Sequence, residues 1–317
     1  MPEDKQPAVL VDHWSAYWAR GALTSLPDDF ASNYDGEIAE FWFAEFARLP
    51  DPSAILDACT GNGALAFLAA AYAQDHKRDI AVTAVDAARI DPQKAVASNT
   101  RLKDLPARIN FIAGTPIEQF SAEANSFDLV ASQYGLEYCD SELAAGRLVN
   151  LIKPKGRLVM LAHALESDMF TTMRAEAAEY ERLDELKIGL LLRSWLSGQL
   201  GSPDLRRRLQ RSGDALADDY RRHPSDLFRY VLLMIRHVVR ADEAELKRSR
   251  PALQDTSDQL RAGQSRLADM LAANGRLADP AWYQPYLDAG LVLTADGGLT
   301  YQQQHHVGHY YAFVKPA

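Results

Sequence analysis

A short stretch near the start of the chain combines an acid with small residues at a spacing that suits ligand binding. ILDACTGNG holds Asp57, Cys59, Gly61 and Gly63, and it lies between an apolar run and the helix-forming segment ALAFLAAA. Glycines let the backbone of a strand-to-helix turn approach a ligand closely, and the N–H groups of the following helix then point toward it. An acid at the end of the strand repels a pyrophosphate but can pair with an ammonium group. The stretch therefore predicts a nucleotide-like ligand that carries an ammonium group.

A second ligand class also fits part of this stretch. GNGALA, residues 61–66, satisfies the G-x-G-x-x-A form of a dinucleotide fingerprint. Asp86 ends the next apolar run, 23 residues after Gly63, where an acid can accept hydrogen bonds from ribose hydroxyls in either class. Two simpler interpretations stay open: Asp57 could cap the turn, and Asp86 could be the N-cap of the next helix.

Apolar runs and helical patterns alternate through residues 51–163. The runs SAILDAC, DIAVTAVD, RINFIAG, FDLVASQY and RLVMLAH read as strands, and residues 64–76, 90–102 and 141–152 between them read as helices. Strands with few polar alternations, separated by helices, indicate a parallel sheet that is covered on both faces. The glycine stretch would then lie at the carboxyl end of the first strand.

The flanking regions differ from this central pattern. Residues 1–50 are rich in aromatic residues at helical spacing, and residues 165–279 carry long amphipathic helical patterns with almost no strand signal. The end of the chain returns to mixed structure. A helix over 281–290 precedes a strand near GLVLTAD, and LTYQQQHHV and HYYAFVKP are expected to pair about Gly308.

ILDACTGNG resembles motif I of the class I S-adenosylmethionine-dependent methyltransferases, which reads D-x-G-x-G-x-G after two apolar residues. Cys59 stands in place of the first glycine. FIAGTPIEQF is similar to the segment that borders the adenine, SFDLVASQYGLEY to motif IV, and LIKPKGRLVML to the entry of the fifth strand in this family. The closing YLDAGLVL and HYYAFVKP resemble its last helix and terminal strands, so the resemblance covers 51–163 and 281–317.

The resemblance implies an α/β fold: a Rossmann-like methyltransferase sheet, mostly parallel with a terminal antiparallel strand. Residues 1–50 would form an N-terminal helical cap, 51–163 with 281–317 the S-adenosylmethionine-binding domain, and 164–280 a helical insertion that serves as substrate site, lid or dimer face. The cofactor would be S-adenosylmethionine and the product S-adenosylhomocysteine. The positions expected to bind the cofactor are Tyr34, Asp57, Cys59, Gly61, Gly63, Asp86, Ala87, Thr115, Pro116 and Gln133.

The side chains that would face the methyl acceptor are few. Methyl transfer can proceed largely by positioning and exclusion of water, so it needs no obligatory catalytic side chain. His163 ends the fifth strand and is either a general base or a structural hydrogen-bonding residue, while Tyr134 and Tyr138 would line the substrate pocket or simply pack. At motif IV the chain reads SQYG. It has neither the N/D-P-P-Y/F pattern of methyltransferases that act on adenine or glutamine amides nor the Pro-Cys of the cytosine-C5 enzymes, so these classes are set aside.

No metal is expected. His305, His306 and His309 are close in sequence, but neighbouring residues of a strand point to opposite faces. The two cysteines are far apart in sequence and read as small packing residues of a protein in a reducing compartment.

Composition narrows the class of partner. The chain has 317 residues and a formal net charge of −9, which argues against nucleic acid as the main partner. No apolar run is long enough to span a membrane, and the acidic start lacks the features of a signal peptide, so a cytoplasmic protein is expected.

The sequence thus predicts an enzyme that methylates O, N or C of a small, partly apolar metabolite. Three alternatives stay open: a protein methyltransferase that docks its substrate on the helical insertion, a non-catalytic cofactor-binding module, and an NAD-dependent oxidoreductase. The insertion is also a candidate face for a homodimer.

Overall fold

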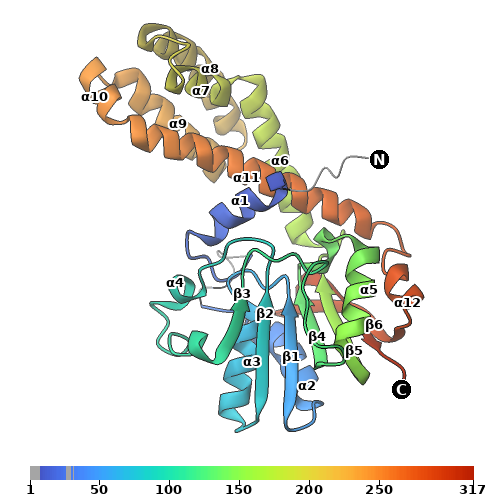
Figure 1. Cartoon of the computed structure of the whole chain (residues 1–317). Helices are drawn as coiled ribbons and strands as arrows, with labels where there is room; N and C mark the ends of the chain where they lie inside the picture. Colours follow the sequence, from blue (N-terminus) through green and yellow to red (C-terminus); the bar gives the residue numbers. More distant parts are fainter. Residues whose placement is uncertain (1–7, 26–29, 31) are drawn as a thin grey trace, which may run out of the picture. The chain divides into compact units, whose positions relative to one another are not determined.

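The computed structural model describes residues 8–25, 30 and 32–317, and its described strands form one sheet (Figure 1). The order across the sheet is β3-β2-β1-β4-β5-β7-β6. β1 to β5 run parallel, whereas β7 pairs antiparallel with both β5 and β6. The strands are β1 (Ser53–Ala58), β2 (Ile80–Val85), β3 (Ile109–Ile112), β4 (Phe127–Gln133), β5 (Ile152–Ala162), β6 (Val292–Tyr301) and β7 (His305–Val314). The expected mostly parallel sheet with a terminal antiparallel pair is confirmed.

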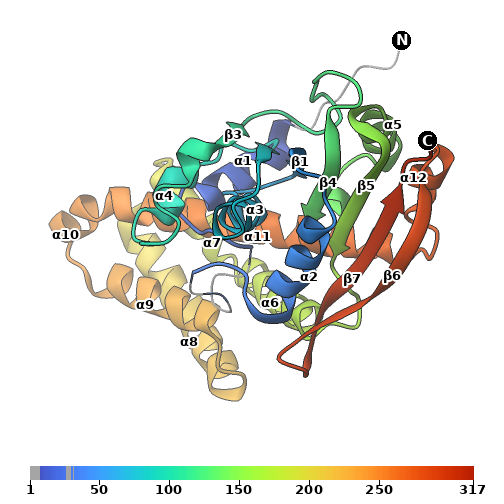
Figure 2. The ribbon, with the colours of Figure 1, turned by 90° about the horizontal axis from the view of Figure 1, so that it is seen from below.

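Helices cover both faces of this sheet, because its central strands are apolar on both sides. In β1, Ile55 packs into the core with α2 and α3, whereas its neighbour Leu56 packs into the core with α5 and α12. Figure 2 shows α2 and α3 on one side of the sheet and α5 on the other. The helices of this part of the chain are α1 (Ala8–Trp18), α2 (Gly36–Ala47), α3 (Ala64–Asp75), α4 (Pro92–Val96), α5 (Ser141–Leu151) and α12 (Gln284–Asp288), with short 3-10 helices η1 (Pro106–Arg108) and η2 (Leu136–Tyr138).

The chain divides into two compact units. One comprises the described residues up to Phe170 and from Asp269 onward, and the other is Thr171–Ala268. The second unit is helical, as the pattern after His163 predicts. Its helices are α6 (Asp168–Glu185), α7 (Ile188–Leu196), α8 (Ser202–Arg222), α9 (Asp226–Arg240), α10 (Glu243–Arg248) and α11 (Arg250–Leu277), of which α6 and α11 extend into the first unit.

Two local expectations are wrong. The helix expected over 90–102 is confined to α4, because the side chain of Asn99 accepts hydrogen bonds from the N–H groups of Arg101 and Leu102 and forms a turn there. The final hairpin turns between Tyr301 and His305, not at Gly308. A Cβ on Gly308 would lie 2.4 Å from the carbonyl oxygen of Ala162, so this glycine permits a close approach between strands.

Among the described residues, no helix is both long enough and apolar enough to cross a membrane.

Candidate active site

The segment after β1 is a tight loop that only glycine can form at two positions. Gly61 has φ +55°, and a Cβ there would lie 2.5 Å from Cζ2 of the Trp18 ring. Gly63 has φ +93° and is the N-cap of α3, where a Cβ would lie 2.7 Å from the Phe111 ring. Both backbones lie in the left-handed region that glycine tolerates best. Trp18 therefore packs directly on the glycine loop.

Asp57, at the end of β1, both holds this loop and keeps one oxygen available. Its Oδ2 accepts hydrogen bonds from Thr60 Oγ1 at 2.5 Å and from the Ala66 N–H at 3.0 Å. Among the described residues, no donor reaches its Oδ1. Burial, with a smaller contribution from the charge of Asp86, raises the pKa of Asp57 to about 7. The interpretation of Asp57 as a cap of the turn is therefore correct, and no positively charged side chain of the described residues pairs with this carboxylate.

Asp86 joins the end of β2 to the glycine loop. Its Oδ2 accepts the Gly61 N–H and its Oδ1 accepts the Ala88 N–H, both at 2.7 Å. Burial raises its pKa to about 6. The N-cap of the following helix is Asp91, so the simpler interpretation of Asp86 as a helix cap is wrong.

A cavity of about 700 Å³ brings most of the expected site residues together. Its walls include Tyr34, Asp57, Cys59, Gly61, Asp86, Ala87, Pro116, Gln133, Tyr134, Tyr138 and His163. Gly63 and Thr115 are not in these walls. Gly63 packs against Phe111, and the Thr115 N–H donates to the backbone carbonyl of Asp86.

Gln133 and Tyr34 present neutral polar groups to the cavity. Gln133 Oε1 accepts a hydrogen bond from Trp42 Nε1 at 2.6 Å, whereas its buried Nε2 has no partner among the described residues. The Tyr34 hydroxyl lies 3.4 Å from Ser25 Oγ, and burial raises the pKa of this phenol to about 12. A neutral amide and an uncharged aromatic ring thus both line the cavity.

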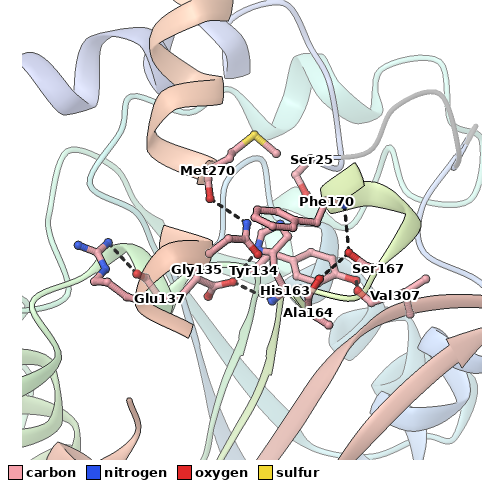
Figure 3. A network of polar contacts seen from close by, with 12 residues as sticks. Ser25, Tyr134, Gly135, Glu137, His163, Ala164, Ser167, Phe170, Met270 and Val307 are labelled. Atoms are coloured by element: carbon pink, nitrogen blue, oxygen red, sulfur yellow. Dashed lines mark hydrogen bonds and ion pairs between the residues drawn. The ribbon is translucent and has the colours of Figure 1, made fainter. Parts of the chain in front are cut away.

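His163 and Glu137 form a buried pair at the carboxyl ends of β5 and β4 (Figure 3). Glu137 Oε1 lies 2.7 Å from His163 Nδ1 and also accepts the His163 backbone N–H at 3.1 Å. The Tyr134 ring lies 4.5 Å from the imidazole, centroid to centroid. His163 lines the cavity, whereas Glu137 holds it from behind.

The cysteines, far apart in sequence, meet in the cavity wall. Cys59 Sγ and Cys139 Sγ are 3.5 Å apart and both are free thiols. Cys139 and burial raise the pKa of Cys59 well above its ordinary value. A protonated thiol is a poor nucleophile, which agrees with a packing role.

A family model described as a methyltransferase domain matches residues 51–213. The chain belongs to this methyltransferase family. The enzyme is an S-adenosylmethionine-dependent methyltransferase, and its glycine loop, its Asp86 and its parallel strands β1 to β5 all fall within the matched region.

Solved structures of methyltransferases are similar to this chain at low sequence identity. Phosphoethanolamine N-methyltransferase 2 of Haemonchus contortus is 14% identical with a TM-score of 0.43, and the match covers 100% of this chain and 62% of that one. Geranyl diphosphate C-methyltransferase of Streptomyces coelicolor A3(2) is 14% identical with a TM-score of 0.37, over 51% and 67% of the two chains. The putative methyltransferase crystallised with the Haloferax volcanii Trm112 activator is 12% identical with a TM-score of 0.45, over 97% and 98%. The comparison with curated protein sequences gave no match.

Several residues of the methyltransferase cavity are not evident as site residues in the sequence. Glu137, behind the cavity wall, lies in the stretch that resembles motif IV, but nothing in that stretch marks it as a partner of His163. Arg276 and Asp269 reach the cavity from α11, more than a hundred residues later. The aromatic pattern HWSAYW does indicate a covering helix, and it supplies Trp14 and Trp18 to the cavity wall.

Asn62, the middle residue of the Gly-Asn-Gly stretch, fastens the segment after α1 to the glycine loop. It is fully buried, and its Nδ2 donates to the carbonyl oxygens of Trp18 at 2.9 Å and Ala22 at 2.7 Å. Its Oδ1 accepts the N–H of Asp91 at 2.8 Å. One side chain thus joins three segments of the methyltransferase.

Replacing Asn62 by Ala should lower the free energy of unfolding by about 2–3 kcal/mol, because one buried and two partly buried hydrogen bonds to the backbone are lost. Urea denaturation measures this loss, and hydrogen exchange should show faster exchange in α1. Asn150→Ala is the matched control, since the exposed side chain of Asn150 donates to the carbonyl of Gly146 in its own helix and to no other described residue. Equal stability of the two variants would show that α1 is held by other contacts.

Proposed function

We propose that this methyltransferase acts on a small, partly apolar molecule that shares the cavity with the cofactor. The observation that carries the proposal is the single cavity of about 700 Å³ that joins the glycine loop and Asp86 to Tyr134, Tyr138 and His163. Its volume lies within the range of about 300–1,000 Å³ that is usual for small-molecule sites. Aromatic side chains form much of the acceptor side, which suits an apolar or flat acceptor.

The polar groups of the cavity fit S-adenosylmethionine. Asp57 Oδ1 would pair with the ammonium group, and the free Nε2 of Gln133 would donate to the carboxylate. Asp86 would accept the ribose hydroxyls, since each of its oxygens has a lone pair left beside its backbone bond. Cys59 and Gly61 would border the methionine end.

The adenine and the sulfonium would have apolar neighbours. Ala87 and Pro116 line the cavity beyond Asp86 and would border the adenine, with Thr115 fixing that segment by its bond to the Asp86 carbonyl. The neutral ring of Tyr34 would lie near the sulfonium, where an aromatic face gains about 0.5–2 kcal/mol from a cation.

Bound S-adenosylmethionine supplies an electrophilic methyl group. The contribution of the chain is then to hold the acceptor in line with that group and to exclude water. Trp14, Trp18, Tyr134 and Tyr138 supply the aromatic walls that would do both.

Calorimetric titration with S-adenosylhomocysteine, with NAD as the parallel ligand, tests the cofactor assignment. We expect micromolar binding of the former alone, and at least a roughly tenfold weakening in Asp86→Ala, equivalent to about 1.4 kcal/mol. Asp128→Ala is the matched control, because Asp128 also accepts a backbone N–H in the sheet, that of Ala54, but does not line the cavity. Unchanged affinity in Asp86→Ala would remove Asp86 from the ribose site.

Transfer of labelled methyl groups into a fractionated cell lysate tests the acceptor class. Label in the small-molecule fraction is expected. Label confined to protein would instead indicate a protein methyltransferase, and no transfer despite cofactor binding would indicate a non-catalytic module.

A further inference from the structure

The Glu137–His163 pair has a geometry that a purely structural histidine does not need. Both residues are 4% exposed, and a single carboxylate oxygen of Glu137 receives both the Nδ1 and the backbone N–H of His163. This double contact fixes the imidazole at its Nδ1 edge and directs the opposite edge away from Glu137. The Arg276 guanidinium donates to the Glu137 carbonyl oxygen at 2.8 Å and helps to hold the segment that carries the acid.

The pair determines which ring nitrogen of His163 carries the proton. An ionised carboxylate only accepts hydrogen bonds, so Nδ1 must be the donor. In the neutral ring, Nε2 then has the free lone pair. Nε2 is therefore the nitrogen that can take a proton.

His163 Nε2 is buried and has no hydrogen-bond partner among the described residues. The same side chain lines the cavity that contains Asp57 and Asp86. The Tyr134 ring packs against the imidazole, and its hydroxyl is fixed by a 2.8 Å bond to the Val307 carbonyl, as Figure 3 shows. An unpaired buried nitrogen costs free energy, and a hydrogen-bonding ligand that reached Nε2 from the cavity would remove that cost.

We propose that the methyl acceptor is a phenol-type hydroxyl, that His163 Nε2 removes its proton, and that Glu137 is the positioning residue of this base. The inference rests on the proposed function and specifies its substrate class. A neutral imidazole is a weak base, so it matches a phenolic or enolic proton and not that of an aliphatic alcohol. The rings of Trp14, Tyr134 and Tyr138 give the cavity walls on which a flat phenol can pack.

The proposed methyl transfer involves the phenol, the cofactor and the His163–Glu137 pair. The phenol oxygen attacks the methyl carbon, a C–O bond forms, and the electron pair of the broken C–S bond goes to the sulfur. The phenol proton moves to His163 Nε2, and the carboxylate of Glu137 compensates the positive charge of the imidazolium. The proton then leaves to solvent when the products dissociate.

Nitrogen-15 NMR of the histidine rings tests the pair without any acceptor. We expect His163 of the full-length protein, with S-adenosylhomocysteine added, to have a protonated Nδ1 and a lone pair on Nε2. Glu137→Ala should give a mixture of the two tautomers, whereas Glu137→Gln keeps an oxygen for both donors and should keep the tautomer. A wild-type His163 protonated at Nε2 would overturn the assignment.

The probe 4-nitrophenol tests the acceptor class, because its phenolate absorbs in the visible. The titration is run at an acidic pH, where only a small fraction of free 4-nitrophenol is ionised. We expect saturable binding to the S-adenosylhomocysteine complex and roughly tenfold more phenolate than in free solution at the same pH, since the proton passes to His163. His163→Gln should abolish this gain, and Glu137→Gln should reduce it severalfold by removing the charge that supports the imidazolium.

Two controls accompany the 4-nitrophenol titration. Glu45→Gln removes another buried acid, one that pairs with Arg157 outside the cavity, and should leave the signal unchanged. Failure to bind 4-nitrophenol, or a gain that depends on Arg276 and not on His163, would overturn the proposal. Calorimetry with S-adenosylhomocysteine is run on the wild type and on every variant. A wild type that does not bind contradicts the proposed function, whereas a wild type that binds normally but gives no phenolate signal contradicts this inference alone.

Discussion

Replacing Gly61 by Ala should weaken S-adenosylhomocysteine binding by roughly 30- to 100-fold, or about 2–3 kcal/mol. The left-handed backbone at this residue costs about 1–2 kcal/mol with any L side chain. The added Cβ would also lie 2.5 Å from Cζ2 of Trp18, a contact that forces the loop and the indole apart. Since both line the cavity, the displacement removes part of the cofactor site. Calorimetry measures the affinity directly.

Two further variants separate strain from contact. Gly290→Ala also places a side chain on a left-handed backbone, φ +101°, but nothing lies within 4 Å of its Cβ and it does not line the cavity. The Gly290→Ala protein should lose stability but keep its affinity for S-adenosylhomocysteine. The double variant Gly61→Ala with Trp18→Ala should recover part of the lost affinity. A Gly61→Ala protein that binds as the wild type would contradict the packing of Trp18 on the loop.

The cofactor-free protein should become less stable relative to its Asp57→Asn variant as the pH rises. Burial raises the pKa of Asp57 from 3.8 to about 7. A carboxyl group whose pKa is raised in the folded state stabilises the fold fully at pH values below its pKa in the unfolded state. This stabilisation is lost as the pH rises through its pKa in the folded state. Between about pH 5 and about pH 8 the wild type should therefore lose about 3 kcal/mol relative to Asp57→Asn. Denaturant unfolding at several pH values measures this difference.

With S-adenosylhomocysteine added, the wild type should be more stable than Asp57→Asn near neutral pH, the reverse of the trend without the ligand. The ammonium group would pair with the ionised Asp57 and stabilise the wild type, whereas the Asn variant offers only a neutral oxygen. Asp51→Asn, an exposed acid of the same unit, is the control for a general effect of charge. A stability difference that does not change with pH would show that Asp57 is not buried as an unpaired acid.

The sequence by itself determined the sheet and the position of the glycine loop. Apolar runs without polar alternation between helical patterns require a parallel sheet with both faces covered, and the structure has this sheet. Asp57, Gly61 and Asp86 were identifiable because each lies at the end of a strand or in the turn that follows it. Parallel strands bring such ends to one edge, so local sequence is enough to bring these residues together.

Only the tertiary structure decided how distant residues meet in the cavity. Glu137 reaches His163 because β4 and β5 pair in a register that sets Gln133 beside Leu161. Cys59 directly follows β1, and Cys139 follows η2, the short helix after β4. The two thiols meet because β1 and β4 are neighbours in the sheet. Strand order and register depend on the packing of the whole core, which no single segment of sequence encodes. Glu137, which orients the candidate base His163 and so determines which ring nitrogen can accept a proton, was visible only in three dimensions.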